Sequence, residues 1–416
     1  MTGSAWSPLP PEPLTGVSAS RFGLYVHFPW CRQRCPYCDF AVTVAPAIPH
    51  EAYLEALLAE LELRLAQSPS LVGRPLDSVF IGGGTPSLWE PRLAGRLLEA
   101  VHARLPISEG AELALEANPG PEDALRFADF RQAGFNRISL GVQSFSERTL
   151  RSLGRSHTPD EAKAAVDAAL RAGFPSVSLD LIYGVQGQTV PEVEADARAA
   201  VSLGTQHLSA YALTLEREAL AVEVPLARAL ARGEVTLPPD AAIVEMAHLL
   251  TDVLGQAGLV RYEVSNFARP GFHSRHNALY WTGGEYLALG AGATGFLLDG
   301  PRAADGGTGV LPGVRYENLR SAPRYLATTR EGRLPEQGRE SLTPAERFEE
   351  RLSLGLRLKD GVALEPLFAL AGEDLAKRAP LLRLFAREGL IEQVGERTRL
   401  TPRGLDVHGA ICSRLI

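Results

Sequence analysis

The segment YVHFPWCRQRCPYCDF at residues 25–40 decides the fold, because it places three cysteines in a C-x3-C-x2-C loop directly after an apolar run. Three thiolates this close in sequence, from Cys31, Cys35 and Cys38, can surround one soft metal centre. In a four-iron cluster they would leave one iron without a protein ligand. A structural zinc site with His27 as fourth ligand is the alternative, but zinc sites usually show two separated ligand pairs. The spacing therefore favours an iron–sulfur cluster.

Composition and cysteine usage describe a globular chain in a reducing compartment. The 416 residues are 45% hydrophobic and 22% charged, which is ordinary for a folded protein with a substantial core. Four cysteines are too few for a disulfide scaffold. Only Cys412 lies outside the group of three, and we interpret it as a bystander. The N-terminus lacks the pattern of a secretory signal, and no apolar stretch is long enough to span a bilayer. We therefore expect a cytoplasmic protein with no transmembrane segment.

Short apolar runs alternate with amphipathic helical stretches through the first half of the chain. The runs are near-continuously apolar, as in the strands of a parallel sheet: Leu24–Phe28, Ser78–Gly82, Glu112–Ala117, Arg137–Val142, Val177–Ile182 and Leu208–Leu213. Apolar residues at three- and four-residue spacing indicate helices between them, at Glu51–Ala66, Pro91–Arg104, Glu122–Ala133, Pro159–Ala172 and Val190–Leu203. Six βα units predict an α/β fold with an incomplete (β/α)6 TIM-type barrel. A doubly wound open sheet is the alternative that periodicity alone leaves open.

The positions of the unusual residues favour the barrel. Polar or glycine-rich sequence follows every apolar run at its C-terminal end: the cysteine loop, GGGTP at 82–86, Glu116, Gln143, Asp180 and Tyr211. Barrel enzymes build their active sites at that rim. We therefore expect these residues to line one site.

The chain divides into four parts. Residues 1–20 are expected to be a disordered N-terminus, 21–230 the barrel, 231–313 a region that completes or connects it, and 314–416 a smaller domain. The smaller domain is mostly helical, with the helix–hairpin–helix order of a winged helix. DNA binding is the functional interpretation of such a fold, but residues 371–416 carry 8 Lys and Arg against 6 Asp and Glu. This near-balance, with a net charge of −7 for the chain, favours a structural domain and no nucleic-acid partner.

Further motifs carry a resemblance that runs from Gly23 nearly to the end of the chain. They are FIGGGTPS (80–87), LEANPG (115–120), RISLGVQSF (137–145), SLDLIYGVQGQT (178–189), YEVSNFARPG (262–271) and HNALYW (276–281). With the cysteine loop, they resemble the oxygen-independent coproporphyrinogen III oxidase-like family of radical S-adenosylmethionine (SAM) proteins. The resemblance implies a radical SAM barrel, a C-terminal domain of the oxidase type and a [4Fe-4S] cluster. The open iron of the cluster would chelate SAM, which reductive electron transfer cleaves to a 5′-deoxyadenosyl radical.

The resemblance also implies which residues contact SAM. Glycines after the second strand let backbone groups approach a ligand closely. Carboxylates and amides suit ribose hydroxyls and the methionyl ammonium group, and an arginine suits a carboxylate. The expected SAM contacts are Tyr25, Tyr37, Gly83, Gly84, Thr85, Glu116, Gln143, Arg155, Asp180 and Ala212.

Two functions within the family compete, and both bind a tetrapyrrole. One is a haem chaperone that uses the cluster and SAM and transfers haem to cytochromes and other respiratory haemoproteins, with a client protein and an electron donor as partners. The other is coproporphyrinogen III oxidase, a dehydrogenase of porphyrin biosynthesis. The oxidases carry a further cysteine two residues after the third and a long N-terminal extension. This chain has Phe40 at the cysteine's position and no long extension, which favours the chaperone; whether it is an enzyme stays open.

Two histidines near the HNALYW motif bear on haem binding. Neutral imidazole ligates haem iron well, so His273 and His276 are weak candidates for an axial ligand. A hydrogen bond that holds a loop in place is the interpretation we favour for both.

Overall fold

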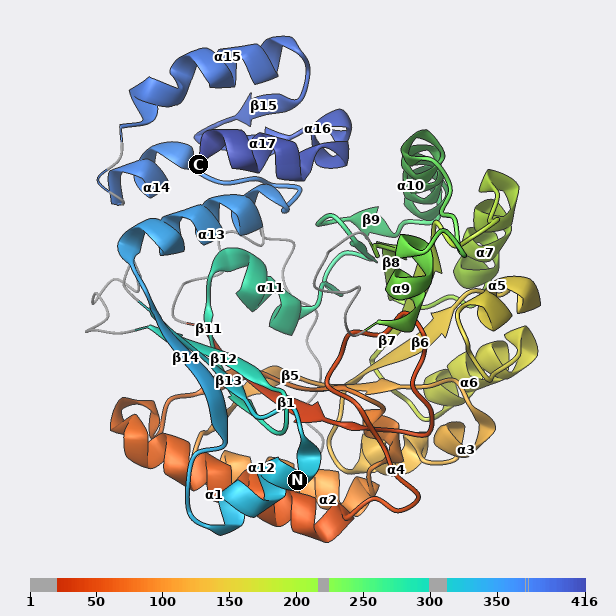
Figure 1. The fold of residues 1–416 in the computed structure, drawn as a ribbon, viewed down its shortest axis with the longest axis vertical. Helices are drawn as coiled ribbons and strands as arrows, with labels where there is room; N and C mark the ends of the chain where they lie inside the picture. Colours follow the sequence, from red (N-terminus) through yellow and green to blue (C-terminus); the bar gives the residue numbers. More distant parts are fainter. Residues whose placement is uncertain (1–20, 216–223, 299–312, 371, 373) are drawn as a thin grey trace.

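The central sheet is built on six parallel strands that follow one another in chain order. The computed structural model describes residues 21–215, 224–298, 313–370, 372 and 374–416 (Figure 1). The expected disordered segment 1–20 lies outside the described residues. The six strands pair in the order β1-β4-β5-β6-β7-β8. Their bounds are β1 Phe22–Phe28, β4 Leu76–Gly83, β5 Ile107–Ala117, β6 Arg137–Gln143, β7 Ser176–Tyr183 and β8 His207–Ala212.

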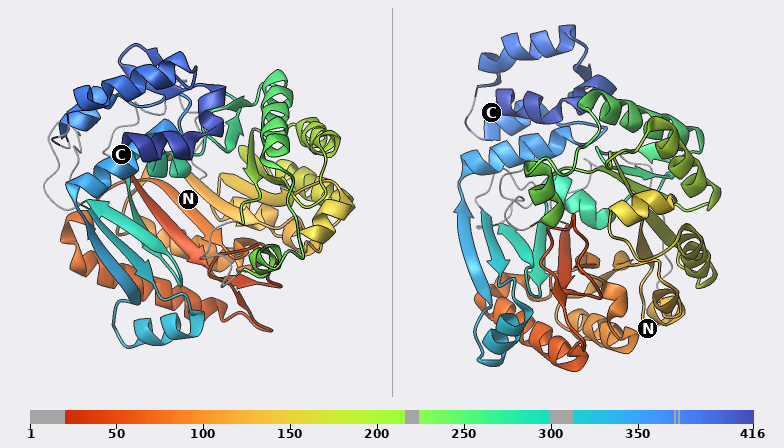
Figure 2. Two further views of the ribbon diagram at one scale, coloured as in Figure 1. Left: turned by 45° about the horizontal axis from the view of Figure 1, so that its top comes forward. Right: turned by 45° about the vertical axis from the view of Figure 1, so that its right-hand side comes forward.

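Helices connect successive strands and form an arc around the outside of the sheet (Figures 1 and 2). They are α1 His50–Gln67, α2 Pro91–His102, α3 Pro121–Ala124, α4 Phe127–Gln132, α5 Glu147–Ser152, α6 Pro159–Arg171 and α7 Val190–Ser202. A doubly wound sheet reverses its strand order part-way and carries helices on both faces. The unreversed order seen here is that of the predicted (β/α)6 barrel, and the doubly wound alternative is wrong.

Strands from the second half of the chain extend both edges of this sheet. Next to β1 lie β11 Glu285–Leu289, β12 Thr294–Leu298, β13 Gly313–Asn318 and β14 Glu336–Leu342; next to β8 lie β10 Asn266–Ala268 and β9 Val260–Arg261. Strand β11 runs parallel to β1, and the others pair antiparallel to their inner neighbours. Over the described residues, β14 and β9 do not pair with each other, so the 12-stranded sheet stays open.

Local sequence signals explain where the helices begin and end. Helix α6 begins with a capping box, in which the Thr158 side chain accepts from the Glu161 amide while the Glu161 carboxylate accepts from the Thr158 amide. The helix expected at 122–133 is instead two short helices, α3 and α4. A tighter turn separates them, in which the Arg126 amide donates to the Asp123 carbonyl at 3.0 Å. The Arg126 guanidinium donates to the Leu88 carbonyl at 3.0 Å, which holds this turn in place.

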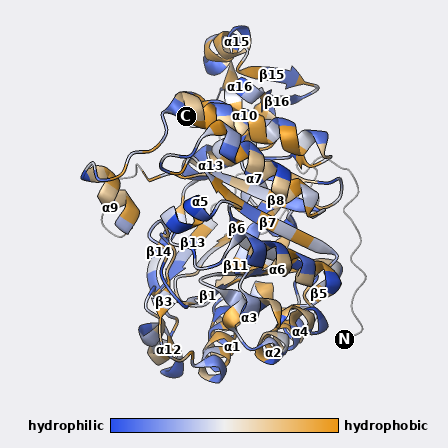
Figure 3. Cartoon of the chain, turned by 90° about the vertical axis from the view of Figure 1, so that its right-hand side faces the viewer, coloured by the Kyte–Doolittle hydropathy of each residue, from blue (hydrophilic) through white to orange (hydrophobic). Residues whose placement is uncertain are grey.

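The core next to the cysteine loop is aromatic. The rings of Phe28, Trp30, Tyr53 and Trp89 are almost fully buried. Phe28 stacks on Trp89 with ring centres 5.6 Å apart, and Trp30 meets Tyr53 edge-on at 4.7 Å. The surrounding helices carry both hydrophobic and hydrophilic residues (Figure 3), as expected for helices with one face on this core. The loop that holds the cysteines therefore starts from a rigidly packed base.

Helix α11 (Arg275–Thr282) covers the amino-terminal side of the sheet, away from the cysteine loop. Glu112 of β5, which is fully buried, accepts hydrogen bonds from the backbone amides of Arg275 and His276 at 3.1 and 3.0 Å. These amides belong to the first turn of the helix, whose free N–H groups favour a negative charge. The HNALYW motif is thereby anchored to the sheet.

The remaining helices support this arrangement or form the C-terminal domain. The first group is α9 Pro225–Ala231, α10 Asp240–Gln256 and α12 Ala322–Arg330. Within the predicted domain 314–416, the part from Pro344 onward contains α13 Pro344–Leu356, α14 Leu364–Leu370, α15 Ala379–Arg387, the hairpin β15 Ile391–Val394 with β16 Arg397–Leu400, α16 Pro402–Asp406 and α17 His408–Leu415. It has its own core, which includes Phe348, Leu352 and Phe385, and lies at one end of the molecule (Figures 1 and 2). The predicted helix–hairpin–helix order is confirmed. Among the described residues, no helix has the length and apolar character needed to cross a membrane.

We expect Trp89→Ala to lower the free energy of unfolding of the metal-free chain by about 3–5 kcal/mol, because it leaves a cavity in the aromatic core. Urea unfolding followed by circular dichroism measures this value. Leu125→Ala is the control, since Leu125 is 81% exposed and its loss should change stability by no more than about 0.5 kcal/mol. A loss for Trp89→Ala no larger than the control's would contradict the packing described.

Candidate functional site

A cavity of about 570 Å³ opens at the carboxyl ends of the parallel strands. Its walls come from the cysteine loop, from the segments that follow β4, β5, β6, β7 and β8, and from the turn before α6. Of the thirteen residues expected to bind the cluster or SAM, twelve line this cavity. They are Cys31, Cys35, Tyr37, Cys38, Gly83, Gly84, Thr85, Glu116, Gln143, Arg155, Asp180 and Ala212. The rim residues of separate βα units thus share one space, as the barrel interpretation requires.

Short pairing at its base closes the cysteine loop. Strands β2 (Trp30–Cys31) and β3 (Thr43–Val44) pair in parallel, with Cys31 opposite Val44. Within the loop, the Cys38 amide donates to the Cys35 carbonyl at 3.2 Å. All three cysteines are free of disulfide bonds, and their side chains line the cavity. In the part of the chain that the structure describes, no three His, Cys, Asp or Glu side chains converge as ligands of a single ion would.

His27, the fourth ligand in the zinc alternative, has both ring nitrogens in use. Nε2 donates to the Ala41 carbonyl at 2.9 Å, so Nδ1 is the acceptor of the Tyr25 hydroxyl, also at 2.9 Å. Burial lowers the pKa of His27 to about 4, although the hydrogen bond to Ala41 acts in the opposite direction. The imidazole is therefore neutral and engaged. The remaining donor set consists of thiols alone, which fits an iron–sulfur cluster and leaves zinc without its fourth ligand.

Burial disfavours the thiolate form of two of the three cysteines while no metal centre is bound. Burial raises the pKa of Cys38 to about 11, and it also raises the pKa of Cys31, against the effect of a hydrogen bond from Thr85. Because thiolates are the ligands, loading a cluster must release the protons of these thiols.

A chain of hydrogen bonds connects two of the cysteines. Arg155 donates from Nη1 to Cys35 Sγ at 3.5 Å and from Nη2 to Asn118 Oδ1 at 2.6 Å. Asn118 donates to Thr85 Oγ1 at 3.0 Å, and Thr85 donates to Cys31 Sγ at 3.4 Å. Hydrogen bonds to cluster sulfurs orient the ligands and tune the reduction potential. Asn118 is not among the site residues predicted from the sequence, although its place in LEANPG, two residues after Glu116, puts it at the same rim.

The glycine run after β4 connects the cavity to strand β1. Gly83 has φ +109°, and a Cβ there would lie 2.6 Å from the His27 ring. Its amide donates to Glu116 Oε2 at 3.0 Å. The glycine run therefore passes close to His27 of β1 and also lines the cavity, while its approach to a ligand stays a prediction.

Two carboxyl groups share the same part of the cavity. Burial, and then the nearby Asp180, raise the pKa of Glu116 to about 8. Burial likewise raises the pKa of Asp180, while hydrogen bonds from Ser209 and Ser139 oppose the shift. Both groups line the cavity. Such a pair favours a cation or several hydroxyl groups as its partner.

Tyr25 is the one predicted contact that does not line the cavity. Its hydroxyl bonds to His27, and its ring stacks on Phe80 with ring centres 6.2 Å apart. The buried His276 ring contacts both, with its centre 5.3 Å from that of Phe80 and 6.3 Å from that of Tyr25.

The haem-ligand candidates lie outside the cavity as well. His276 Nδ1 bonds to the Ser78 hydroxyl at 2.9 Å and Nε2 to the Tyr280 hydroxyl at 2.8 Å. The expected structural hydrogen bond is present, but it connects helix α11 to strand β4 and does not hold a loop. Axial ligation by His276 would require one of these bonds to break. His273 packs against the Tyr262 ring, with ring centres 4.5 Å apart.

Comparison with known proteins agrees with this geometry. Residues 25–200 match the Radical SAM superfamily, and residues 342–407 match the HemN C-terminal domain. Heme chaperone HemW of Mycobacterium tuberculosis is 36% identical over 414 residues, which cover 99% of this chain and 96% of that protein. The chain belongs to the HemW family of radical SAM proteins. HemW of Escherichia coli is 43% identical over 280 residues, covering 67% of this chain and 71% of that protein.

A solved structure shares the fold of this HemW family member. Coproporphyrinogen III oxidase (HemN) of Escherichia coli, a radical SAM enzyme, superimposes with a TM-score of 0.75 at 21% identity, covering 97% of this chain and 92% of that one. At this identity the likeness concerns the fold alone. It confirms the radical SAM barrel with a helical C-terminal region.

We expect Glu116→Gln to change how the stability of the metal-free chain depends on pH. The folded chain holds the Glu116 proton up to a pKa of about 8, whereas an unfolded Glu loses it near 4.3. The stabilising contribution is therefore full at low pH and is lost as the pH rises to about 8. The variant does not titrate, and its amide oxygen can still accept from Gly83. Its stability relative to wild type should thus rise between about pH 5 and pH 8.

Urea unfolding at several pH values measures this difference. Because Glu116 lines the cavity and is only partly buried, the slope should stay below the one-proton limit of about 1.4 kcal/mol per pH unit. Glu122→Gln at the cavity mouth is the control, since a hydrogen bond from Arg32 lowers the pKa of Glu122 and keeps it from titrating in this range. Parallel pH curves for Glu116→Gln and wild type would refute the assignment.

Proposed function

We propose that this protein is a radical SAM haem chaperone, which holds a [4Fe-4S] cluster and SAM in the cavity and transfers haem to cytochromes and other respiratory haemoproteins. The observation that carries the proposal is the 36% identity to heme chaperone HemW over 99% of the chain. A thiol-walled cavity at the carboxyl ends of the strands supports it. A reducing, cytoplasmic setting, a client protein and an electron donor belong to the same proposal.

The cluster would be held by Cys31, Cys35 and Cys38. Thr85 and Arg155 donate hydrogen bonds to two of these sulfurs and would stabilise their negative charge when they are deprotonated. When bound, the cluster supplies the electron that cleaves SAM. The residues of the chain supply its position and the polarity around it.

The chemistry of SAM matches the opposite wall of the cavity. Its methionyl ammonium and ribose hydroxyls suit Glu116 and Asp180, whose pKa values are raised chiefly by burial. A cation bound between them would lower both pKa values and thereby gain binding free energy. Arg155 carries a buried Nε without a hydrogen-bond partner, and it offers a donor for the carboxylate of SAM.

Phe40 distinguishes haem transport from coproporphyrinogen oxidation. It stands where the resemblance to the oxidases would require a cysteine, it lines the cavity, and it is 54% exposed. A large exposed aromatic ring at a cavity edge offers an apolar surface of the kind a tetrapyrrole face would cover. Loss of the extra cysteine together with this surface supports binding of haem as cargo.

One assay separates the two functions. The anaerobically reconstituted protein should bind haem, seen as a shifted haem absorbance band on titration. It should leave coproporphyrinogen III unconverted in the presence of SAM and a reductant. Conversion to protoporphyrinogen IX with consumption of SAM would show that the protein is the oxidase, and absence of haem binding would also reject the chaperone proposal.

We expect Cys35→Ala to abolish the broad visible absorbance of the reconstituted cluster and most of its bound iron. The loop provides three thiolates, and the cluster needs all of them as ligands. Cys412→Ala is the matched control, because Cys412 is a buried cysteine of the C-terminal core outside the loop. It should keep wild-type iron content. Full iron content and absorbance in Cys35→Ala would overturn the ligand assignment.

A further inference from the structure

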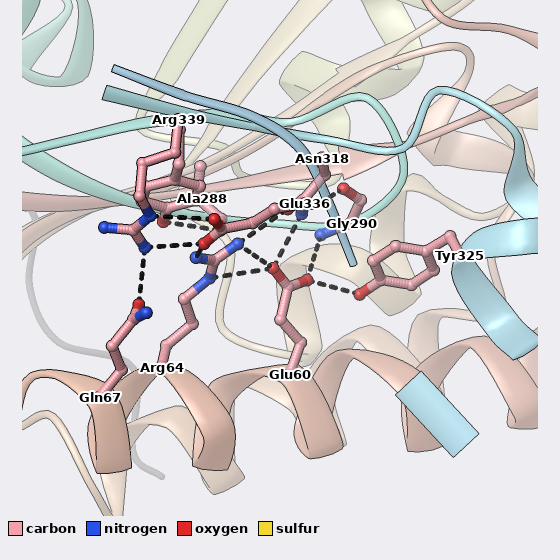
Figure 4. Close-up of polar contacts among 10 residues, drawn as sticks. Glu60, Arg64, Gln67, Ala288, Gly290, Asn318, Tyr325, Glu336 and Arg339 are labelled. Atoms are coloured by element: carbon pink, nitrogen blue, oxygen red, sulfur yellow. Dashed lines mark hydrogen bonds and ion pairs between the residues drawn. The ribbon is translucent and has the colours of Figure 1, made fainter. Parts of the chain in front are cut away.

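A buried carboxylate on α1 lies at the centre of a polar network that reaches β11, β13, β14 and α12 (Figure 4). Glu60 is 0% exposed. Its Oε1 accepts from Nε and Nη2 of Arg64 at 3.2 and 3.1 Å, and from Asn318 Nδ2 at 2.8 Å. Its Oε2 accepts from the Gly290 amide at 3.0 Å and the Tyr325 hydroxyl at 2.7 Å. Both oxygens are therefore fully used, and the side chain has one orientation that satisfies every donor.

The network holds the turn that follows β11. Besides the bond from its amide to Glu60, Gly290 accepts at its carbonyl from Asn318 Nδ2 at 2.8 Å. Gly290 has φ +103°, and a Cβ there would lie 2.4 Å from the His27 carbonyl oxygen. Tyr53, also on α1, donates its hydroxyl hydrogen bond to that same carbonyl. The turn thus lies in direct backbone contact with the end of β1, where the cysteine loop begins.

The same turn touches the far limb of the cysteine loop. A Cβ at Gly292, which has φ +78°, would lie 2.3 Å from the Cβ of Ala41. Ala41 follows Cys38 by three residues, and its carbonyl accepts from His27. Arg320, two residues beyond Asn318, donates to the carbonyl of Asp39 at 2.8 Å. Both limbs of the loop therefore rest on backbone that the buried network holds.

We propose that Glu60 is a positioning residue for the iron–sulfur cluster: its bond to the Gly290 amide fixes the turn at 290–293, and the turn sets the position of the cysteine loop. The inference rests on the proposed cluster-binding function. It adds a residue that touches neither a cysteine nor the cavity.

Glutamine cannot replace Glu60 in this role. The Gly290 amide faces Oε2 and the Arg64 guanidinium faces Oε1, and both groups can only donate. Whichever way the amide of a glutamine is turned, its NH2 group meets one of these donors. Glu60→Gln should therefore release either the turn or Arg64 without changing the size of the side chain.

Glu336→Gln is the matched control. Glu336 is the second carboxylate bound to Arg64, and its other bonds go to Arg339. This variant removes one charge from the same network and leaves the bonds of Gly290 in place. A merely structural network would make the two variants alike, whereas a positioning role requires them to differ at the cysteine loop.

The experiment compares the full-length variants in two states. In the reconstituted protein, the rate of iron loss to a chelator and the electron paramagnetic resonance spectrum of the reduced cluster are measured. In the metal-free chain, the rates at which iodoacetamide alkylates Cys31, Cys35 and Cys38 are measured by mass spectrometry. Glu60→Gln should lose iron about tenfold or more faster than wild type, with a changed spectrum and faster alkylation. Glu336→Gln should keep wild-type values in all three, whatever its unfolding midpoint.

Gly292→Ala keeps the test decisive if Glu60→Gln does not fold. It perturbs the contact between the turn and Ala41 directly, and it should accelerate iron loss and alkylation in the same direction. Wild-type rates in Gly292→Ala, or equal shifts in Glu60→Gln and Glu336→Gln, would overturn the positioning role. The alkylation rates need no cluster, so they test this inference separately from iron binding by the wild-type chain, which tests the proposed function.

Discussion

The hydrogen bond from His27 to the Ala41 carbonyl joins the two limbs of the cysteine loop, and the rest of the site depends on it. Burial keeps the imidazole neutral, with the Tyr25 hydroxyl fixing the other nitrogen. The glycine run after β4 approaches the ring from one side, and the turn after β11 contacts the backbone of the same residue. The strands that pair with β1 on either side, β4 and β11, therefore determine where the loop can lie. A histidine that looks like a metal ligand in sequence serves as a structural connection between these segments.

The barrel could be predicted because its signals are local. Each of the six inner strands is an apolar run that ends in polar sequence, and the amphipathic helices between them begin and end with recognisable caps. The outer strands gave no such signal. Strand β14 is mostly exposed and polar along Glu336–Leu342, and its partner β13 is also antiparallel and distant from the barrel strands in sequence. Their place in the sheet follows from long-range pairing, which periodicity does not report.

The sequence predicted which residues at the strand ends line the candidate site, but not the side chains that hold those residues in place. Residues at the ends of parallel strands must meet, so Glu116, Gln143 and Asp180 share the cavity as expected. Side chains that act through others have no comparable signature. Asn118 links Arg155 to Thr85 only because three separate βα units converge there. Tyr25 shows the reverse case, in which a residue next to the motif turns into the interior.

The short pairing of β2 with β3 gives the cysteine loop a closed base, with Cys31 opposite Val44. The two ends of the loop are fixed by the sheet and by the aromatic core, while the residues between them cross the cavity wall. The cysteine loop is thus a separate segment that the sheet and the aromatic core hold at both ends. Cys31, Cys35, Cys38 and Phe40 line the cavity between these fixed ends, and none of them belongs to a strand of the 12-stranded sheet. In this architecture, the residues that face the cavity are largely separate from the residues that hold the barrel together.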